Sequence, residues 1–241
     1  GKTVAMTEFL SLADLRAFAR DCLTRANAPR RVANAVAAEI AAAEAAGERQ
    51  HGMEALLRDI RLMRYGRLDA AAQAEMSQPR AGFVRLDARH GFAAAALSGA
   101  MTVFAELTRT QGIALLRLDH ASDPGGMIRA TAALAERGLA ALAFGPEGPG
   151  RLAHPDLAAP AALHHPPRAA LRLLLPDIGL GQPADSPLGE MVGHVAWLVG
   201  LDAELAGDSF ATAEIWDIAI PPATAASIAC SAELLEQIVT A

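Results

Sequence analysis

The chain has 241 residues, of which 52% are hydrophobic and 20% are charged, so it has enough apolar content to bury a large core. Its 27 acidic and 21 basic residues give a formal net charge of -6, and no Lys/Arg-rich run occurs, which argues against a nucleic acid partner. Two cysteines are too few for a disulfide framework, and no apolar stretch is long enough to cross a membrane, so we expect a soluble cytoplasmic protein.

The first quarter of the chain is predicted to be helical. Apolar residues recur at spacings of three and four through residues 11–46, and the break at residues 27–29 divides this stretch into two helices. Gly47 is a typical C-terminal glycine for the second of them. A third helix is expected over residues 52–65. Its predicted outward-facing side chains are Glu54, Arg58, Asp59 and Arg61.

After a loop rich in Ala, Gln and Pro, strands and helices alternate. Apolar runs predict strands at residues 82–87, 112–118 and 139–144, and amphipathic stretches predict helices at residues 92–111 and 128–137. This alternation predicts the α/β class, with right-handed crossovers if the strands run parallel.

The remainder of the chain is more irregular in composition. Residues 145–167 are rich in proline and glycine, which predicts an irregular connector. Beyond it we expect strands at residues 172–176 and 215–220, and helices at residues 188–205 and 224–239.

Three segments, in order along the chain, resemble signatures of the type-2 malate/L-lactate dehydrogenases. These are NAD(P)H-dependent reductases of 2-oxoacids and cyclic imines that lack a Rossmann fold. Residues 43–68 contain His51-Gly52 where the family has Asp-Ser-His-Gly, residues 83–144 follow its order of elements, and residues 187–210 are similar to its late glycine-rich helix. The resemblance implies an α/β fold in which an N-terminal helical layer packs with an α/β sheet layer.

The resemblance also implies a division of the chain. We expect an N-terminal helical, substrate-side region at residues 7–80 and a shortened cofactor-type α/β region at residues 81–180. Residues 181–241 are expected to complete the fold as helix, strand and helix.

Departures from the family pattern fall on positions that carry chemistry. Ala55 stands where the family has an Arg for the substrate carboxylate, Asp123 where it has a second histidine, and Glu190 where it has a lysine. Reduction of a 2-oxoacid needs a cation for the carboxylate and a proton donor. We therefore expect a repurposed small-molecule enzyme that performs proton transfer, cyclisation or isomerisation in a biosynthetic pathway. An NAD(P)H-dependent oxidoreductase acting on a 2-oxoacid or cyclic imine, and a non-catalytic pseudoenzyme or partner subunit, stay open as alternatives.

Five residues are candidates for the site. His51 begins a helix and is a catalytic candidate because an imidazole titrates near neutral pH. His120 follows a buried strand and could replace the missing histidine through a small gap, and Asp123 could act as a base, although both also suit a turn or a helix cap. Gln50 and Arg58 are the expected substrate contacts.

Other ligand classes have little support. His154, His164 and His165 fit no ordinary zinc spacing, and no phosphate-binding loop motif occurs, so we expect no metal and no cofactor, with NAD(P)H as the second possibility. The expected partners are a small-molecule ligand and, by resemblance to the family, a second copy or a paralogue in a dimer. No nucleic acid and no membrane partner are expected.

Overall fold

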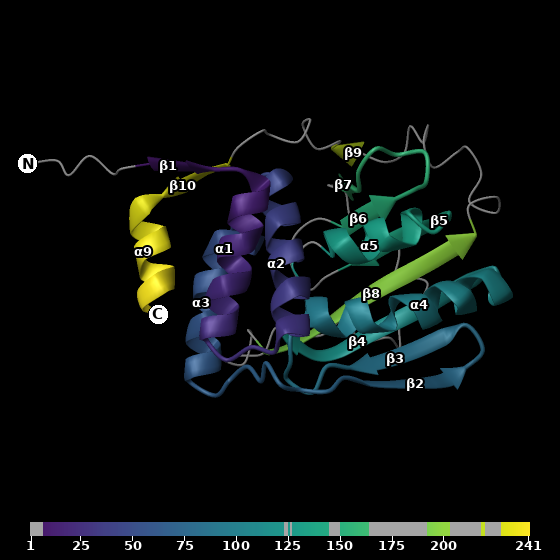
Figure 1. Ribbon diagram of the computed structural model, residues 1–241. Helices are drawn as coiled ribbons and strands as arrows, with labels where there is room; N and C mark the ends of the chain where they lie inside the picture. Colours follow the sequence, from purple (N-terminus) through teal and green to yellow (C-terminus); the bar gives the residue numbers. More distant parts are fainter. Residues whose placement is uncertain are drawn as a thin grey trace, which may run out of the picture.

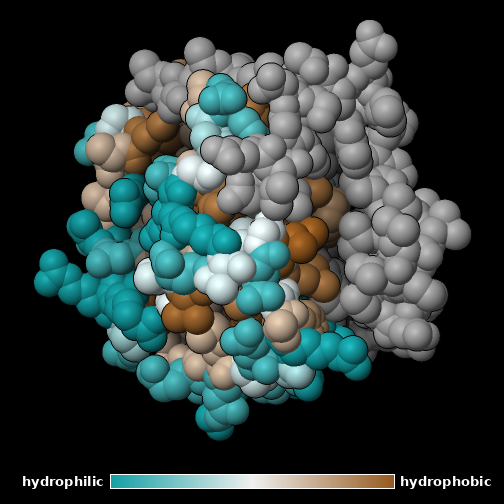
Figure 2. All heavy atoms as spheres, turned by 90° about the vertical axis from the view of Figure 1, so that its right-hand side faces the viewer, coloured by the Kyte–Doolittle hydropathy of each residue, from teal (hydrophilic) through white to brown (hydrophobic). Residues whose placement is uncertain are grey.

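The computed structural model consists of a helical layer beside a layer of helices on a mixed β-sheet (Figure 1). It describes residues 7–122, 125, 127–144, 150–163, 192–202, 218–219 and 228–241. This architecture confirms the predicted α/β class with an N-terminal helical layer. Figure 2 shows that hydrophilic side chains cover much of the described part of one face, with smaller apolar patches between them.

The helical layer has its own hydrophobic core. Its elements are β1 (Thr7–Leu10), α1 (Leu12–Arg25), α2 (Arg30–Ala45), α3 (Met53–Arg64), β10 (Ile228–Ser231) and α9 (Ala232–Thr240). Ser11 begins α1, because its side chain accepts a hydrogen bond from the backbone N–H of Asp14 at 3.1 Å. The apolar stripes of the helices meet around Leu15, Val36 and Leu56. Strands β1 and β10 pair antiparallel, which holds α9 beside the first helices (Figure 1).

The sheet carries a second core. Its strands are β2 (Glu75–Arg80), β3 (Phe83–Asp87), β4 (Ile113–Ser122), β5 (Leu139–Phe144), β6 (Gly150–Ala153), β7 (Ala161–Leu163), β8 (Val192–Asp202) and β9 (Ile218–Ala219). Their order is β2-β3-β4-β8-β5-β6-β7-β9, with β3 and β4 parallel. Helices α4 (Ala93–Gln111) and α5 (Ile128–Ala135) contact the sheet, where Leu86, Phe104 and Leu116 are buried together.

The predicted helix at residues 188–205 is wrong over the part that the structure describes. Residues Val192–Asp202 form β8, which lies antiparallel between β4 and β5 and separates these two strands. A continuous apolar run does not distinguish a strand that is covered on both faces from a buried helix. A β-carbon at Gly200 would lie 2.4 Å from Oγ1 of Thr108, so this glycine allows α4 to approach β8 closely.

Several shorter predictions also need correction. The irregular connector expected at residues 145–167 contains β6 and β7. The loop expected before residue 82 contains β2. All six residues of β2 are exposed, so the strand lacks the alternation of apolar and polar residues that would have predicted it. The final helix begins only at Ala232 because β10 precedes it. The expected strand at residues 172–176 lies outside the described residues, the expected strand at 215–220 is described only at β9, and the three-region division stays a prediction.

None of the helices in the described ranges has both the length and the apolar character that a bilayer crossing requires.

Candidate active site

His51 lies in a tight turn between two helices of the helical layer. The chain reverses after α2 at Gly47, which has a φ of 77°, and a short 3-10 helix, η1 (Arg49–His51), leads into α3. The imidazole is buried, with 9% of the residue exposed. The turn that begins at Gly47 therefore brings His51 to a buried position at the inner side of the helical layer.

A small cavity of about 30 Å³ lies between the two layers at His51. Residues of the helical side include His51, Arg58 and Asp59, and residues of the sheet side include Ser122 and Gly125. The remaining wall residues are Val36, Glu39, Ile40, Ala55, Phe92 and Ala94. The cavity lies at the carboxyl end of β4, which is where α/β proteins usually bind ligands. Its volume corresponds to about one water molecule.

Glu39 connects the helical layer to the sheet layer at this cavity. Its carboxylate is buried and accepts hydrogen bonds from the backbone N–H groups of Ile128 at 2.7 Å and Arg129 at 2.9 Å. Burial raises the pKa of Glu39 above its usual value, and the two amide donors act in the opposite direction. Because both amides belong to the first turn of α5, Glu39 holds α2 against the start of that helix.

Glu44 and Gly52 fix the start of α3, directly after His51. The Glu44 carboxylate is buried and accepts a hydrogen bond from the backbone N–H of Met53 at 2.7 Å. Burial raises the pKa of Glu44. A β-carbon at Gly52 would lie only 2.1 Å from Oε1 of Glu44, so the residue after His51 has no room for a side chain.

Replacing Gly52 with alanine is expected to destabilise the protein by about 1–3 kcal/mol, because the new methyl group displaces the Glu44 carboxylate from the helix start. Gly99→Ala is the matched control. Gly99 lies within α4, where an added β-carbon would meet no heavy atom within 4 Å, and the helix should gain about 0.5–1 kcal/mol from alanine. Urea unfolding of both variants measures the two changes, and equal effects of the two substitutions would contradict the steric argument.

Arg58 and Asp59 reach the cavity from α3. Nε of Arg58 lies 3.2 Å from Oδ1 of Asp59, and their side chains are 28% and 8% exposed. The prediction that Asp59 faces outward is wrong. Helix α3 contacts the other helices on one side and borders the cavity with further residues. Asp59 is therefore buried although it lies outside the apolar stripe of the helix. Glu54 and Arg61 are exposed as predicted.

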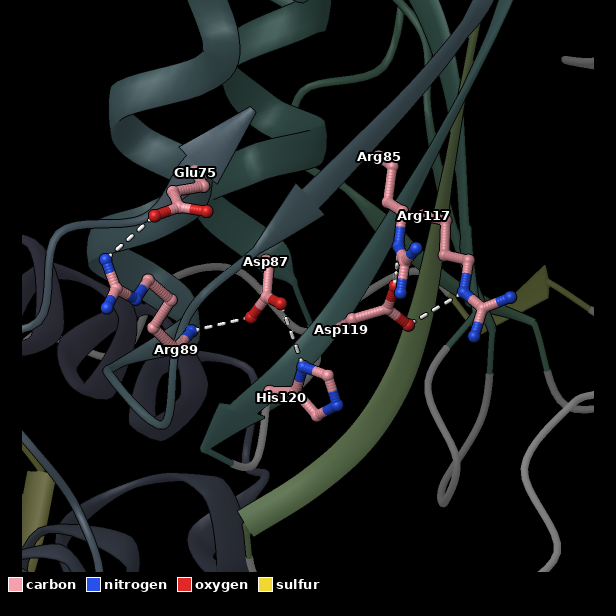
Figure 3. A network of polar contacts seen from close by, with 7 residues as sticks. All are labelled: Glu75, Arg85, Asp87, Arg89, Arg117, Asp119 and His120. Atoms are coloured by element: carbon pink, nitrogen blue, oxygen red, sulfur yellow. Dashed lines mark hydrogen bonds and ion pairs between the residues drawn. The ribbon is translucent and has the colours of Figure 1, made fainter. Parts of the chain in front are cut away.

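His120 lies in a different polar network, which Figure 3 shows at the ends of β3 and β4. Its Nδ1 is 3.0 Å from Oδ2 of Asp87, and its side chain is half exposed. The backbone N–H of Arg89 also donates to Asp87. Burial opposes ionisation of Asp87, but these two hydrogen bonds, together with electrostatic attraction to His120 and Arg85, outweigh burial and lower the pKa of the carboxyl group. His120 does not line the His51 cavity.

The other predicted site residues also differ in whether they line the His51 cavity. Arg58 shares the cavity with His51, whereas Gln50 is exposed and does not line it. Asp123 lies outside the described residues, although Ser122 and Gly125 on either side of it border the cavity. Roles for the five predicted site residues stay predictions. Within the described ranges, no group of three or more His, Cys, Asp or Glu side chains is arranged to hold a metal ion.

Three polar residues of the cavity wall were not predicted as site residues from the sequence, namely Glu39, Asp59 and Ser122. Glu39 does leave a signal, because it is an acidic residue among the apolar positions Val36 and Ile40 of the α2 stripe. Ser122 has a structural role as well, since its Oγ accepts a hydrogen bond from the backbone N–H of Ala93 at the start of α4.

Solved structures share this fold over nearly the whole chain. A dehydrogenase from Sinorhizobium meliloti matches with a TM-score of 0.77 at 16% sequence identity, covering 98% of this chain and 99% of that one. Delta1-piperideine-2-carboxylate reductase from Pseudomonas syringae pvar. tomato matches with a TM-score of 0.70 at 18% identity, covering 97% of this chain and 99% of that one. At these identities the similarity establishes the fold alone.

Curated relatives are more similar in sequence over a shorter stretch. Delta(1)-pyrroline-2-carboxylate reductase from Pseudomonas fluorescens is 28% identical over 143 residues, which is 58% of this chain and 43% of the relative. Delta(1)-pyrroline-2-carboxylate/Delta(1)-piperideine-2-carboxylate reductase from Pseudomonas putida is 32% identical over 111 residues, 46% of this chain and 33% of the relative. The match therefore spans less than half the length of either relative.

These relatives contradict the expectation that the chain has exchanged hydride transfer for proton transfer, cyclisation or isomerisation. Both proteins are named as reductases of cyclic imines. The expectation rested on the departures from the family pattern at Ala55, Asp123 and Glu190. For the first of these, Arg58 on the same helix borders the same cavity and offers another cation. The expectation that the protein needs no cofactor depended on this loss of hydride transfer, so it is no longer supported.

The family relationship covers the part of the chain that forms this cavity. A family model described as malate/L-lactate dehydrogenase matches residues 10–159. This range is more than half of the chain and includes His51, Arg58 and all the other residues that line the cavity. The chain belongs to the malate/L-lactate dehydrogenase family.

Proposed function

We propose that this protein reduces a small cyclic imine that carries a carboxylate next to the C=N bond, with NAD(P)H as the hydride donor. The observation that carries the proposal is the convergence of His51 and Arg58 on one cavity between the two layers. Relatives named for reduction of pyrroline-2-carboxylate support this substrate class.

Reduction of an imine needs one hydride at carbon and one proton at nitrogen. NAD(P)H, when bound, supplies the hydride. His51 is the proton donor in this proposal, because its imidazole lies at the cavity and a histidine side chain is suited to proton transfer in the physiological range. Burial of the imidazole keeps bulk water away from the group that transfers the proton.

Arg58 is proposed to hold the substrate carboxylate. Its guanidinium can form two parallel hydrogen bonds to a carboxylate, which fixes both position and orientation. Asp59 contacts Nε of Arg58 at 3.2 Å and so orients the guanidinium. In this proposal the cation has moved from position 55 to position 58, about one helical turn along α3, and Ala55 leaves space beside it.

The cavity must widen to admit a five-membered ring. Its volume of about 30 Å³ corresponds to about one water molecule. His51 and Arg58 belong to the helical layer, whereas Ser122 and Gly125 belong to the sheet layer. We propose that the substrate binds as the two layers separate and that their closure then removes water from the site.

A direct assay tests the proposed function. The purified chain is mixed with NADPH or NADH and with delta(1)-pyrroline-2-carboxylate, and the loss of reduced nicotinamide absorbance is followed. Pyruvate serves as a matched 2-oxoacid without a C=N bond. We expect turnover with the imine that exceeds turnover with pyruvate. Absence of turnover with every pair of substrate and cofactor would contradict the proposal.

Arg58→Gln is expected to raise the KM for the imine carboxylate by about 10- to 100-fold, because it removes a charged hydrogen-bond donor. The kcat should change less than the KM, since the substrate carboxylate does not react. Arg61→Gln, on the exposed side of the same helix, is the control and should leave both constants unchanged. Equal KM values for Arg58→Gln and the unmodified protein would remove Arg58 from the proposed site.

A further inference from the structure

A second, larger cavity shares Glu39 and Ala94 with the His51 cavity. It has a volume of about 360 Å³ and is lined by residues of α1, α2, α4 and α5. Four arginines contribute to its wall, namely Arg16, Arg31, Arg129 and Arg137. Its apolar residues include Leu97 and Met101 of α4. The cavity wall therefore combines buried apolar side chains with arginine residues from three different helical segments.

The charge of this cavity differs from that of the whole chain. The protein has a formal net charge of -6, yet among the described residues the only carboxylate in the cavity wall is Glu39, which already accepts two backbone hydrogen bonds. Nη2 of Arg129 lies 3.4 Å from Oε1 of Glu136, a residue that is outside the cavity wall. The cations in the wall thus outnumber the carboxylates, and the local field favours an anion.

We propose that this arginine-lined cavity binds the phosphate group of a small molecule. Phosphate matches the planar guanidinium fork through paired hydrogen bonds, and several arginines can contact its separate oxygens. The apolar side chains of Leu97 and Met101 in the wall suit a ring or a carbon chain attached to that phosphate.

The phosphate site is adjacent to the proposed active site. Glu39 and Ala94 line both cavities, and the backbone of Arg129 is hydrogen-bonded to Glu39. Two sources of the phosphate are consistent with this position. One is a phosphate of the NAD(P)H cofactor, in which case the inference rests on the proposed function. The other is a free phosphorylated metabolite that acts as an effector.

Binding of inorganic pyrophosphate to the full chain tests the site without any activity measurement. Isothermal titration calorimetry should detect pyrophosphate binding that weakens by about tenfold or more in Arg31→Gln and in Arg129→Gln. Both side chains are exposed, so the variants are expected to fold, and circular dichroism checks this. Arg67→Gln removes the same charge from an exposed position outside the cavity and should bind as the unmodified protein does.

A pair of nucleotides separates the two sources. If the cofactor supplies the phosphate, adenosine 5′-monophosphate and adenosine 2′,5′-bisphosphate should bind in this cavity, and Arg31→Gln should weaken their binding. Failure of both nucleotides to bind, together with arginine-dependent pyrophosphate binding, assigns the site to a free metabolite. Absence of pyrophosphate binding, or equal affinity in the cavity variants and Arg67→Gln, would overturn the proposal whether or not the protein reduces imines.

Discussion

Replacing His51 with alanine is expected to lower the kcat for imine reduction by about 100- to 10,000-fold, which is the usual contribution of a general acid. The imidazole is buried at the cavity between the two layers, and no other histidine lines that cavity among the described residues. The KM should change less, because Arg58 holds the carboxylate in the proposed complex. Steady-state kinetics with delta(1)-pyrroline-2-carboxylate and NADPH measure both constants.

Two other histidines serve as controls for this substitution. His90→Ala removes an exposed imidazole outside the cavity and should leave the kcat unchanged. His120→Ala tests the competing prediction that this residue replaces the family's second histidine. A large loss of kcat in His120→Ala, with normal turnover in His51→Ala, would transfer the proton-donating role to the network in Figure 3.

Replacing Arg151 with methionine is expected to destabilise the protein by about 3–5 kcal/mol, because it leaves a largely buried carboxylate without its cation. Arg151 lies in β6 with its side chain 2% exposed, and its guanidinium forms an ion pair with Glu48 of the turn that leads to His51. Oε2 of Glu48 is buried and has no hydrogen-bond partner among the described residues. The ion pair therefore holds the His51 turn against the sheet layer.

Urea unfolding measures the free energy of unfolding that Arg151→Met loses. Two further variants test whether the unpaired charge of Glu48 causes this loss. In the double variant Glu48→Gln with Arg151→Met, much of the stability should return, since the unpaired charge is gone. Arg109→Met breaks the exposed pair with Glu106 and should cost about 1 kcal/mol or less. If Arg151→Met costs no more than Arg109→Met, the ion pair does not hold the layers together. The kcat of Arg151→Met should also fall, because the turn that positions His51 becomes loose.

Much of the fold is a local property of the sequence. The boundaries of α1, α2, α3 and α4 fall within a few residues of the prediction, because apolar spacing and signals such as Ser11 and Gly47 act within one or two turns. Strands β3 and β5 are predictable for the same reason, as short apolar runs between turns. The His51-Gly52 pair is recognisable from its position in a family motif.

The cavity depends on contacts between distant parts of the chain, and only the tertiary structure decided them. The ion pair of Glu48 and Arg151 joins residues 103 positions apart, and Glu39 reaches an amide 89 positions away. The insertion of β8 between β4 and β5 is equally remote from any local pattern. Helical periodicity shows which side chains share a face, but a polar side chain such as Asp59 is buried only when another layer covers that face. The sequence alone therefore identified the helices α1 to α4 and the candidate histidine His51, whereas packing of the two layers determined which charges surround this histidine.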